Sequence, residues 1–260
     1  MNAAVDFSLF KRNELDHQDR RYGRARPNAY DRDRFAREFL LPIHEGGNAR
    51  GELYSRAFAK RPSGRVLDYA CGKGHLAIRL AMDANDVSAF DVSPEGIRVA
   101  RRQAELSNVK VDFRVMDAEH LEYEDESFDG VIGFEALHHV IIYPRMPSEL
   151  HRVMKPGAKA VFAENWGGDN PVFDVWRRNT SLKKHNSSSR GEVILNRRLL
   201  DEHLSGWFDI EVEAFSLTYM LKKYVSSSAV CAALYGLDKA LLRLPVERFC
   251  GESVITLTKR

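Results

Sequence analysis

Three acidic residues at regular places along the chain are the side chains best suited to hold a polar ligand. Asp68 begins the segment Asp68-Tyr69-Ala70-Cys71-Gly72-Lys73-Gly74, whose glycines allow a tight turn and a close approach of the backbone to a ligand. The turn leads into a predicted helix start, where backbone N–H groups are unpaired. A dinucleotide-binding fold would favour G-x-G-x-x-G here, whereas a carboxylate before the turn suits a ligand with an ammonium group. We therefore expect a zwitterionic ligand beside this loop.

Two further acids follow the next two predicted strands. Asp91 closes the run VSAFDVS, 23 residues after Asp68, where a carboxylate can accept two hydrogen bonds from ribose hydroxyls. Asp117 begins the corner Asp117-Ala118-Glu119, which can bond the exocyclic amine of adenine while Ala118 leaves space for the ring. The alternatives are that Asp91 only caps a loop and that Asp117 is a helix N-cap.

The candidates for proton transfer are two histidines and one glutamate. His138 and His139 follow the run FDGVIGFEAL, and neutral histidine near pH 7 can act as a general base. Since one of two adjacent residues usually packs inward, we expect at most one of them to touch a substrate. Glu164, in VFAENW, is the third candidate, with a role as a hydrogen-bond partner as its alternative. Trp166 is expected either to line an apolar substrate wall or to pack in the core.

An alternation of strands and helices must position these groups. Apolar runs predict strands at residues 65–69, 86–90, 109–115, 130–134, 159–164, 208–215 and 254–258. Helical spacing follows the first strand, and it follows the second, where Ser93 is an N-cap and Pro94 the first helical residue. Such alternation produces right-handed crossovers and a parallel sheet covered on both faces, which is the doubly wound α/β class. The sequence does not determine the order of the strands.

A family resemblance covers most of this region. The segments VLDYACGKG, AFDVSPEGI, VMDAEHL, FDGVIGFEALHHV and ELHRVMKPGA occur in this order between residues 64 and 164. Together they resemble the class I S-adenosylmethionine-dependent methyltransferases, particularly the group acting on small molecules that is similar to ubiquinone- and menaquinone-biosynthesis enzymes. The resemblance implies a Rossmann-like seven-stranded sheet whose last strand is antiparallel, with S-adenosylmethionine as cofactor and S-adenosylhomocysteine as product.

The resemblance also implies which residues contact the cofactor. Asp68, Asp91 and Asp117 correspond to the acids near its ammonium, ribose and adenine, and Phe134 to a position whose backbone carbonyl faces the methionine amine. The expected cofactor contacts are Asp68, Tyr69, Ala70, Gly72, Gly74, Asp91, Val92, Asp117, Ala118 and Phe134. Ala70 departs from the family pattern, because many members carry glycine there, and we expect the methyl group to be tolerated with a slight loss of affinity.

The chain is expected to divide into an N-terminal helical cap, residues 1–60, and a methyltransferase domain, residues 61–260. Within the cap, Tyr30–Leu40 is expected to be helical, either as a solvated helix or as a lid. Residues 166–200 form a long insertion between the fifth and sixth strands, with seven Lys and Arg against three acids. We interpret this insertion and the cap together as a substrate cap suited to an acceptor carboxylate or phosphate, the alternative being a solvated loop.

Composition limits the class of protein further. The 260 residues are 44% apolar and 29% charged with a formal net charge of +2, which indicates a globular chain without a footprint for a polyanion. Three widely spaced cysteines predict neither a disulfide framework nor a zinc site and fit a reducing cytoplasm. The N-terminus has no signal-peptide core, and the apolar stretch 229–235 is too short to span a membrane. The oligomeric state is left open, a homodimer included.

The preferred function is transfer of a methyl group to an oxygen or nitrogen of a small molecule in specialised metabolism. A second hypothesis is C-methylation of an unsaturated or anionic substrate such as a prenyl diphosphate, supported only by the basic insertion. A nucleic-acid methyltransferase is disfavoured, because Glu135-Ala136-Leu137-His138 replaces the Asn/Asp-Pro-Pro-aromatic motif that would hold a flipped base. We therefore expect no nucleic-acid partner. A non-catalytic cofactor-binding module is disfavoured by the three intact acids.

Overall fold

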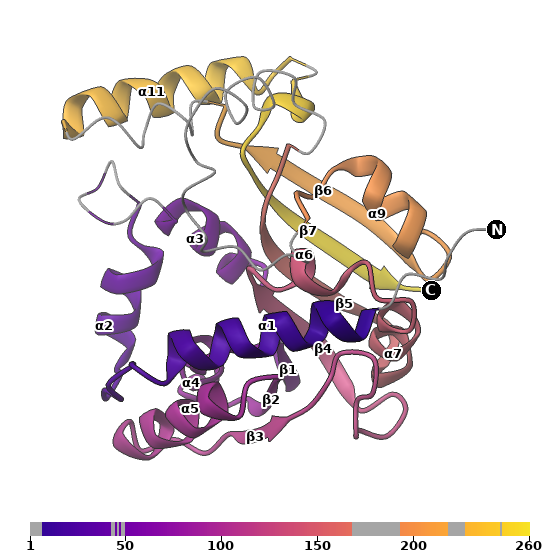
Figure 1. Ribbon diagram of the computed structural model, residues 1–260. Helices are drawn as coiled ribbons and strands as arrows, with labels where there is room; N and C mark the ends of the chain where they lie inside the picture. Colours follow the sequence, from indigo (N-terminus) through magenta and orange to yellow (C-terminus); the bar gives the residue numbers. More distant parts are fainter. Residues whose placement is uncertain are drawn as a thin grey trace.

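A mixed sheet of seven strands runs through the centre of the molecule (Figure 1). This computed structural model describes residues 7–42, 45, 47, 50–167, 193–217, 227–244 and 246–260. The strands are β1 (Arg65–Tyr69), β2 (Asp86–Asp91), β3 (Asp112–Val115), β4 (Phe128–Phe134), β5 (Met154–Asn165), β6 (Phe208–Phe215) and β7 (Glu252–Lys259). Their order is β3-β2-β1-β4-β5-β7-β6, with β1 to β5 parallel and β7 antiparallel to both of its neighbours. The predicted doubly wound sheet with an antiparallel last strand is confirmed.

β3 is shorter than the strand predicted over residues 109–115. The residues before it complete the end of helix α5 (Pro94–Leu106) instead. Asn108 adopts a φ of +54°, and the N–H of Val109 bonds back to the carbonyl of Ala104. An asparagine in the left-handed region is a common way to end a helix, so the apolar Val109 belongs to that ending rather than to the strand.

β5 begins five residues before the predicted start at residue 159, and Pro156 and Gly157 lie inside it. Phe128 pairs with Met154 there, whereas Gly130 pairs with Lys159, so the register of β4 and β5 shifts between the two pairs. The proline and glycine therefore form an irregularity within a strand pairing.

Helices cover both faces of the sheet. On one face α3 (Gly51–Ala59), α4 (His75–Ala81) and α5 contact β1, β2, β3, β5 and β7. On the other face α6 (Leu137–Val140) and α7 (Met146–Val153) contact β5, and α9 (Arg197–Leu204) contacts β6. The remaining described helical segments are α1 (Phe7–Tyr22), α2 (Arg32–Phe35), the π-helix η1 (Ala36–Leu40), α11 (Ser228–Leu241) and the 3₁₀ helix η4 (Glu247–Phe249).

Each face has its own apolar core, and β1 contributes to both. Val66 packs with residues of α3, α4 and α5, whereas Leu67 and Tyr69 pack with residues of α6 and α7. This alternation follows from the two-residue repeat of a strand. It also directs Asp68 to the same side as Val66, toward the first turn of α4.

The described residues before β1 form helices α1, α2, η1 and α3, which are joined by short connecting segments. The helix predicted over Tyr30–Leu40 is present as α2 followed by η1. Helix α1 packs along α5 and crosses in front of the sheet (Figure 1). Of the predicted insertion over residues 166–200, residues 168–192 lie outside the described residues, so its role as a substrate cap stays a prediction.

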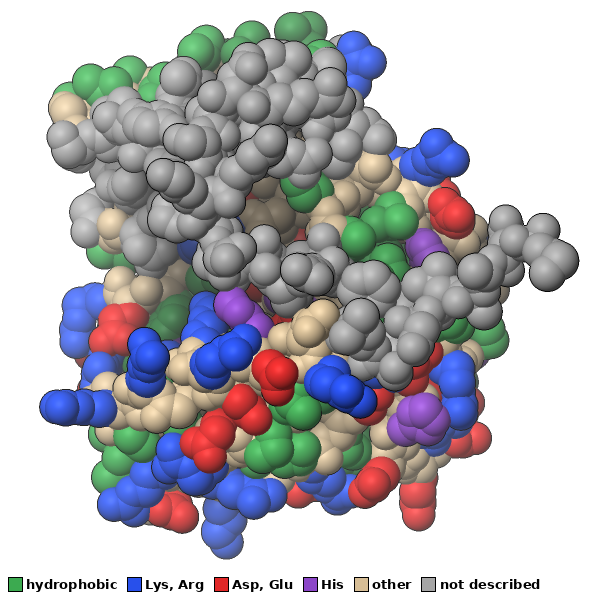
Figure 2. Space-filling view, in the orientation of Figure 1, with side chains coloured by type: hydrophobic (Ala, Val, Ile, Leu, Met, Phe, Trp, Pro, Cys, Tyr) green, Lys and Arg blue, Asp and Glu red, His purple; other side chains and the backbone are tan. Residues whose placement is uncertain are grey.

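The surface carries charges of both signs. On the face seen in Figure 2, basic and acidic side chains are mixed over the described residues around α1 and α5, as the small net charge of +2 leads one to expect. Among the described residues, none of the helices combines the length and the apolar composition needed to cross a membrane.

Candidate active site

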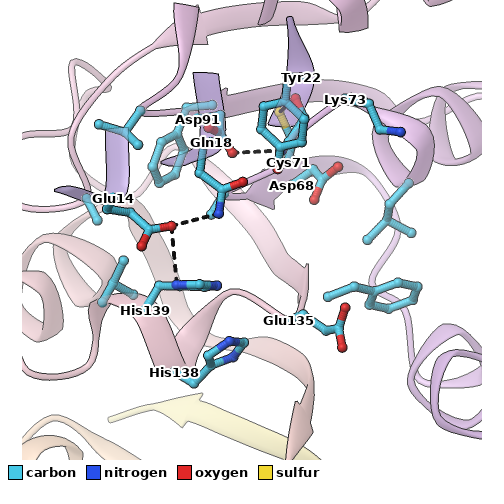
Figure 3. Close-up of a pocket in the computed structure, with 18 of the residues that line it drawn as sticks. Glu14, Gln18, Tyr22, Asp68, Cys71, Lys73, Asp91, Glu135, His138 and His139 are labelled. Carbon is cyan, nitrogen blue, oxygen red and sulfur yellow. Dashed lines mark hydrogen bonds and ion pairs between the residues drawn. The ribbon is translucent and has the colours of Figure 1, made fainter. Parts of the chain in front are cut away.

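A cavity of about 480 Å³ opens at the carboxyl ends of the parallel strands, where it is lined by residues that follow β1, β2, β3 and β4. From β1 the chain continues to β2 and β3 on one side, and it then returns to β4 on the other side of β1, so the strand order switches between β1 and β4. Open α/β sheets bind ligands in the crevice at such a switch of strand order. Figure 3 shows the labelled side chains from the loops after β1, β2 and β4 converging on this cavity with side chains of α1.

Asp68 is buried at the end of β1. Its Oδ2 accepts a hydrogen bond from the N–H of Ala77 in the first turns of α4, at 2.9 Å. Burial, together with the charge of Asp91, raises the pKa of Asp68 to about 8. A carboxyl group in this state gains strongly from a cationic partner, which replaces the solvation that burial removes. Asp68 is therefore well suited to a ligand with an ammonium group.

Asp91 fastens the glycine-rich loop to the end of β2. Its Oδ2 accepts the N–H of Gly72 at 2.8 Å, and its Oδ1 accepts the N–H of Ser93 at 2.9 Å. Burial raises the pKa of Asp91, and these two backbone hydrogen bonds oppose the shift. Each carboxylate oxygen has a second lone pair, so the group can still accept hydrogen bonds from a ligand.

Asp117 is held from two sides. Its Oδ1 accepts the N–H of Glu119 at 2.9 Å, and its Oδ2 lies 2.6 Å from the Nζ of Lys11. Lys11 also pairs with Glu119 at 2.5 Å, so one lysine of α1 joins both acids of this corner. Ala118 lines the cavity beside them, and its role of leaving space for a ring stays a prediction.

Two glycines of the loop after β1 have left-handed backbones. Gly72 has a φ of +53°, and a Cβ at this position would lie 2.7 Å from the hydroxyl of Tyr22 in α1. Gly74 has a φ of +74°, and its Cβ would lie 2.7 Å from the ring of Phe113. Helix α1 therefore packs closely against Gly72, and the apolar core packs closely against Gly74. Ala70 shares this backbone region with a φ of +54°, which glycine adopts readily and alanine disfavours.

Substitution of Gly72 by alanine is expected to lower the free energy of unfolding by about 1–3 kcal/mol, because alanine disfavours the left-handed backbone and its methyl group would meet Tyr22. Gly206→Ala is the matched control, since a Cβ there meets nothing within 4 Å. Chemical denaturation measures both variants. Equal stability of the two variants would contradict the packing of Tyr22 on the loop.

His138 and Glu164 form a buried pair between α6 and β5. The Nδ1 of His138 lies 2.7 Å from Oε2 of Glu164. The other carboxylate oxygen accepts the N–H groups of Ala136 and Leu137 at 2.9 and 2.7 Å. Because an ionised carboxylate only accepts hydrogen bonds, Nδ1 carries the hydrogen when His138 is neutral, and the lone pair lies on Nε2.

The second histidine has a different partner. His139 Nδ1 lies 3.3 Å from Oε1 of Glu14 in α1, and the two histidine rings are 4.1 Å apart. Both histidines line the cavity. The expectation that at most one of them touches a substrate stays a prediction.

Aromatic and charged residues form the side of the cavity near α3. The ring of Tyr54 stacks on Phe134 at 4.7 Å, nearly parallel to it. The Tyr54 hydroxyl donates a hydrogen bond to Glu135 at 2.9 Å, and Arg50 pairs with the other oxygen of Glu135 at 3.0 Å. Asn165, at the end of β5, accepts a hydrogen bond from Arg50 at 2.8 Å. This side therefore offers a flat apolar surface beside a fixed carboxylate.

Most of the residues selected from the sequence meet at the cavity. Those that line it are Asp68, Ala70, Gly72, Asp91, Val92, Asp117, Ala118, Phe134, His138 and His139. Tyr69, Gly74 and Glu164 do not line it: the Tyr69 side chain is in the core, and Glu164 lies behind His138. Trp166 packs in the core as well, where its Nε1 donates to the carbonyl of Glu247 at 3.1 Å.

The sequence reasoning missed the residues of α1 that line the cavity. Lys11, Glu14, Gln18 and Tyr22 recur at three- and four-residue intervals, and this spacing places them on one face of a helix. A polar stripe at this spacing was the available signal. It was hidden by the high density of charge in the N-terminal segment, which favours a solvated helix.

Comparisons with known proteins match the part of the chain that contains strands β1 to β4. The family model described as "Methyltransferase domain" matches residues 66–157. The chain is 40% identical over 115 residues to a ubiquinone biosynthesis O-methyltransferase of Methylocella silvestris, covering 44% of this chain and 41% of the relative. It is 31% identical over 156 residues to a demethylmenaquinone methyltransferase of Symbiobacterium thermophilum, covering 53% of this chain and 62% of the relative. The matches thus span about two fifths to three fifths of the relatives' length.

Solved structures share the fold. A protein of Pyrococcus horikoshii has a TM-score of 0.56 at 20% identity, covering 82% of this chain and 90% of its own. A phosphoethanolamine N-methyltransferase of Haemonchus contortus, solved in complex with S-adenosyl-L-methionine, has a TM-score of 0.57 at 20% identity, covering 99% of this chain and 60% of its own. At this identity the likeness concerns the fold alone.

The fold and the cavity define an α/β protein of the Rossmann-like class with acids at the ends of three neighbouring strands. The family match within this fold identifies the class more closely. The chain carries a class I, S-adenosylmethionine-dependent methyltransferase domain.

Proposed function

We propose that the protein transfers a methyl group from S-adenosylmethionine to an oxygen or nitrogen of a small acceptor, with His138 as the base. The observation that carries the proposal is the pairing of His138 with the buried Glu164 at the wall of the cavity that also contains the three acids. A base is needed when the acceptor is a hydroxyl or an ammonium group.

The hydrogen-bond acceptors of the cavity fit this cofactor. S-adenosylmethionine carries an ammonium group, two ribose hydroxyls and an adenine amine, all of which donate hydrogen bonds. Asp68, Asp91 and Asp117 offer acceptors along one side of the cavity, and Asp91 has lone pairs to spare. In the proposal these three acids hold the ammonium, the ribose and the adenine. The cofactor supplies a methyl group on a sulfonium, which is a strong leaving group.

The protein's own contribution is alignment and one proton transfer. Glu164 holds the His138 ring by Nδ1, and its second oxygen is fixed by two backbone N–H groups. The ring is thereby kept in the tautomer whose Nε2 can accept a proton from the acceptor as its oxygen or nitrogen attacks the methyl carbon. Orientation of the two reactants in one cavity provides the remaining acceleration.

The lining near α3 supports an acceptor with a flat apolar group. Tyr54 and Phe134 present stacked rings, and Glu135 beside them can accept a hydrogen bond from an acceptor hydroxyl. The two relatives are named for ubiquinone biosynthesis and for demethylmenaquinone, which agrees with a quinone-like acceptor. The alternative of C-methylation depended on the basic insertion 166–200, and most of that segment lies outside the described residues.

A radiolabelled transfer assay tests the proposal. The purified protein is incubated with S-adenosyl-[methyl-³H]methionine and a panel of catechols, hydroquinones, simple phenols and aromatic amines. We expect label in at least one hydroxylated or amino acceptor, with methanol-stable ether or amine products. Transfer only to ring carbon would contradict the O/N assignment. Absence of measurable S-adenosylhomocysteine binding in calorimetry would contradict the proposal as a whole.

The raised pKa of Asp68 makes cofactor affinity dependent on pH. Only the ionised carboxylate pairs with an ammonium group, and below pH 8 the buried Asp68 keeps its proton in the ligand-free protein. Affinity for S-adenosylhomocysteine is therefore expected to rise from pH 6 to pH 7.5. The stability of the ligand-free protein changes with pH in the opposite direction to the cofactor affinity. Because burial raises the pKa of Asp68 from 3.8, its contribution to the free energy of unfolding is present below pH 3.8 and is lost as the pH rises toward 8.

Calorimetric titrations at several pH values, in buffers of different ionisation enthalpy, measure this dependence. Asp68→Asn is the matched variant, because it keeps the size of the side chain and cannot ionise. It is expected to bind more weakly and with a flat pH profile. A wild-type affinity that is constant over this range would show that Asp68 is already ionised.

A further inference from the structure

Helix α1 contacts the loops after β1, β2, β3 and β4. Lys11 pairs with Asp117 after β3, Glu14 with His139 after β4, and Asp19 with Ser93 after β2. Near the C-terminus of the helix, the ring of Tyr22 covers two glycines, Gly72 in the loop after β1 and Gly96 in α5. A helix that only shields the domain from water would not need polar contacts with three of these loops. The face of α1 toward the cavity is therefore a candidate part of the ligand site itself.

Gln18 lies in the middle of this face and is buried, with 7% of its surface exposed. Its Nε2 donates a hydrogen bond to Oε1 of Glu14 at 2.7 Å. Its Oε1 is buried and has no hydrogen-bond partner among the described residues. Buried polar atoms in folded proteins are nearly always paired, so this oxygen requires a donor.

The orientation of the Gln18 amide is fixed by chemistry. Glu14 can only accept hydrogen bonds when it is ionised, so the nitrogen of the amide must face Glu14 and the oxygen must face away from it. Gln18 lines the cavity, and Figure 3 shows it between Glu14 and Asp91 with its Oε1 directed into the space that the labelled residues enclose. A donor for this oxygen would therefore come from the contents of the cavity.

The neighbouring groups indicate which donor this is. Asp91 lies near Glu14, whose charge contributes to the raised pKa of Asp91. The two carboxylates and the Gln18 oxygen thus present acceptors on one side of the cavity. A ligand that matches them carries adjacent hydroxyl groups, and the ribose of S-adenosylmethionine has two. A phosphate or carboxylate would be repelled by the same arrangement.

We propose that Gln18 Oε1 accepts a hydrogen bond from a ribose hydroxyl of the cofactor next to Asp91, so that helix α1 is a binding element of the cofactor site. This inference rests on the proposed function, because it takes S-adenosylmethionine as the ligand. It adds a residue outside residues 66–157, the range that matches the methyltransferase family.

Calorimetry with S-adenosylhomocysteine and its 2′-deoxy and 3′-deoxy analogues tests the proposal without requiring an acceptor. Gln18→Met keeps the length of the side chain and removes the amide oxygen. It is expected to bind S-adenosylhomocysteine about five- to tenfold more weakly than the wild type, as for loss of one hydrogen bond. The matched control is Arg20→Met, which places the same side chain at an exposed position of the same helix and is expected to bind as the wild type does.

The deoxy analogues separate a direct contact from a loosened helix. If Gln18 holds one hydroxyl, removing that hydroxyl weakens binding to the wild type and has a smaller effect, or none, on Gln18→Met. If Gln18→Met merely loosens α1, both analogues lose as much affinity on the variant as on the wild type, and the proposal is overturned. Equal binding of S-adenosylhomocysteine by Gln18→Met and wild type overturns it too.

The proposed function and this inference fail in different ways. A wild-type protein that does not bind S-adenosylhomocysteine removes the proposed function, and the inference falls with it. A wild-type protein that binds it while Gln18→Met is unaffected removes the inference alone. Thermal denaturation checks that the variant is folded, and Gln18→Ala, for which the same pattern is expected, replaces it should Gln18→Met fail to fold.

Discussion

Replacing Asp91 with alanine is expected to weaken S-adenosylhomocysteine binding by about 1–3 kcal/mol, roughly five- to 150-fold in the dissociation constant. Two causes act together. The variant loses the carboxylate that we assign to the ribose hydroxyls. It also leaves the N–H groups of Gly72 and Ser93 without the acceptor that ties the glycine-rich loop to the end of β2. Because those N–H groups are buried, the free energy of unfolding is expected to fall as well.

Asp86→Ala is the control for this variant. Asp86 lies at the other end of the same strand, and its side chain is largely exposed and lies 3.7 Å from the guanidinium of Arg65. We expect its affinity and stability to remain within experimental error of the wild type. Calorimetry gives the affinity and urea denaturation the stability. An Asp91→Ala protein that binds S-adenosylhomocysteine as tightly as Asp86→Ala would overturn the assignment of the cofactor site.

The fold was largely predictable because its strands are buried on both faces. Such strands are continuous apolar runs bounded by polar turns, and β1 begins and ends at the predicted residues. β6 also has the predicted bounds, but it is a half-exposed edge strand, and its signal is the alternation of apolar and acidic residues. The predicted bounds of a strand were wrong where an apolar residue could belong either to the strand or to the end of the preceding helix. Val109 ends α5 instead of starting β3, and which of these occurs depends on the left-handed backbone of Asn108. The strand order depends on contacts between distant segments and could not be read from local pattern.

The candidate site was predictable where it follows the ends of strands. Asp68, Asp91 and Asp117 each follow a strand of the parallel sheet, and parallel strands bring their carboxyl ends to one edge. Gln18 and Tyr22 belong to a separate helix, whose position is set by packing on Gly72 and Gly96. No periodic pattern in the sequence specifies that this helix packs on these two glycines. The N-terminal segment was therefore interpreted as part of a substrate cap, while the residues of α1 that line the cavity were not predicted.

The pairing of Glu164 with His138 separates the roles of two residues that the sequence could only group as candidates. Glu164 is fully buried behind the ring and does not line the cavity, so it cannot itself take a proton from an acceptor. His138 lies between Glu164 and the cavity. In our proposal His138 is thus the catalytic base, and Glu164 is a positioning residue that acts through it.

Substitution of Glu164 by glutamine is expected to lower kcat by about 10²–10⁴-fold, the range typical of general-base catalysis, with little change in affinity for S-adenosylhomocysteine. Glutamine has the same shape, and its oxygen can still accept the N–H groups of Ala136 and Leu137. Its NH₂ group then faces Nδ1 of His138 and donates to it. This forces the hydrogen onto Nε2, so the ring presents an N–H to the acceptor and can no longer accept its proton.

The neighbouring histidine provides a control for the role of the His138 tautomer. His138→Ala is expected to lose activity to at least the same extent as Glu164→Gln, and the double variant no more than either, because both changes remove one function. His139→Gln changes the adjacent ring, which pairs with Glu14 and not with Glu164. It is expected to retain most of kcat. Steady-state kinetics with the acceptor found in the transfer assay measures all four proteins. Full activity of Glu164→Gln would refute the base mechanism, and additive losses in the double variant would assign the two residues separate functions.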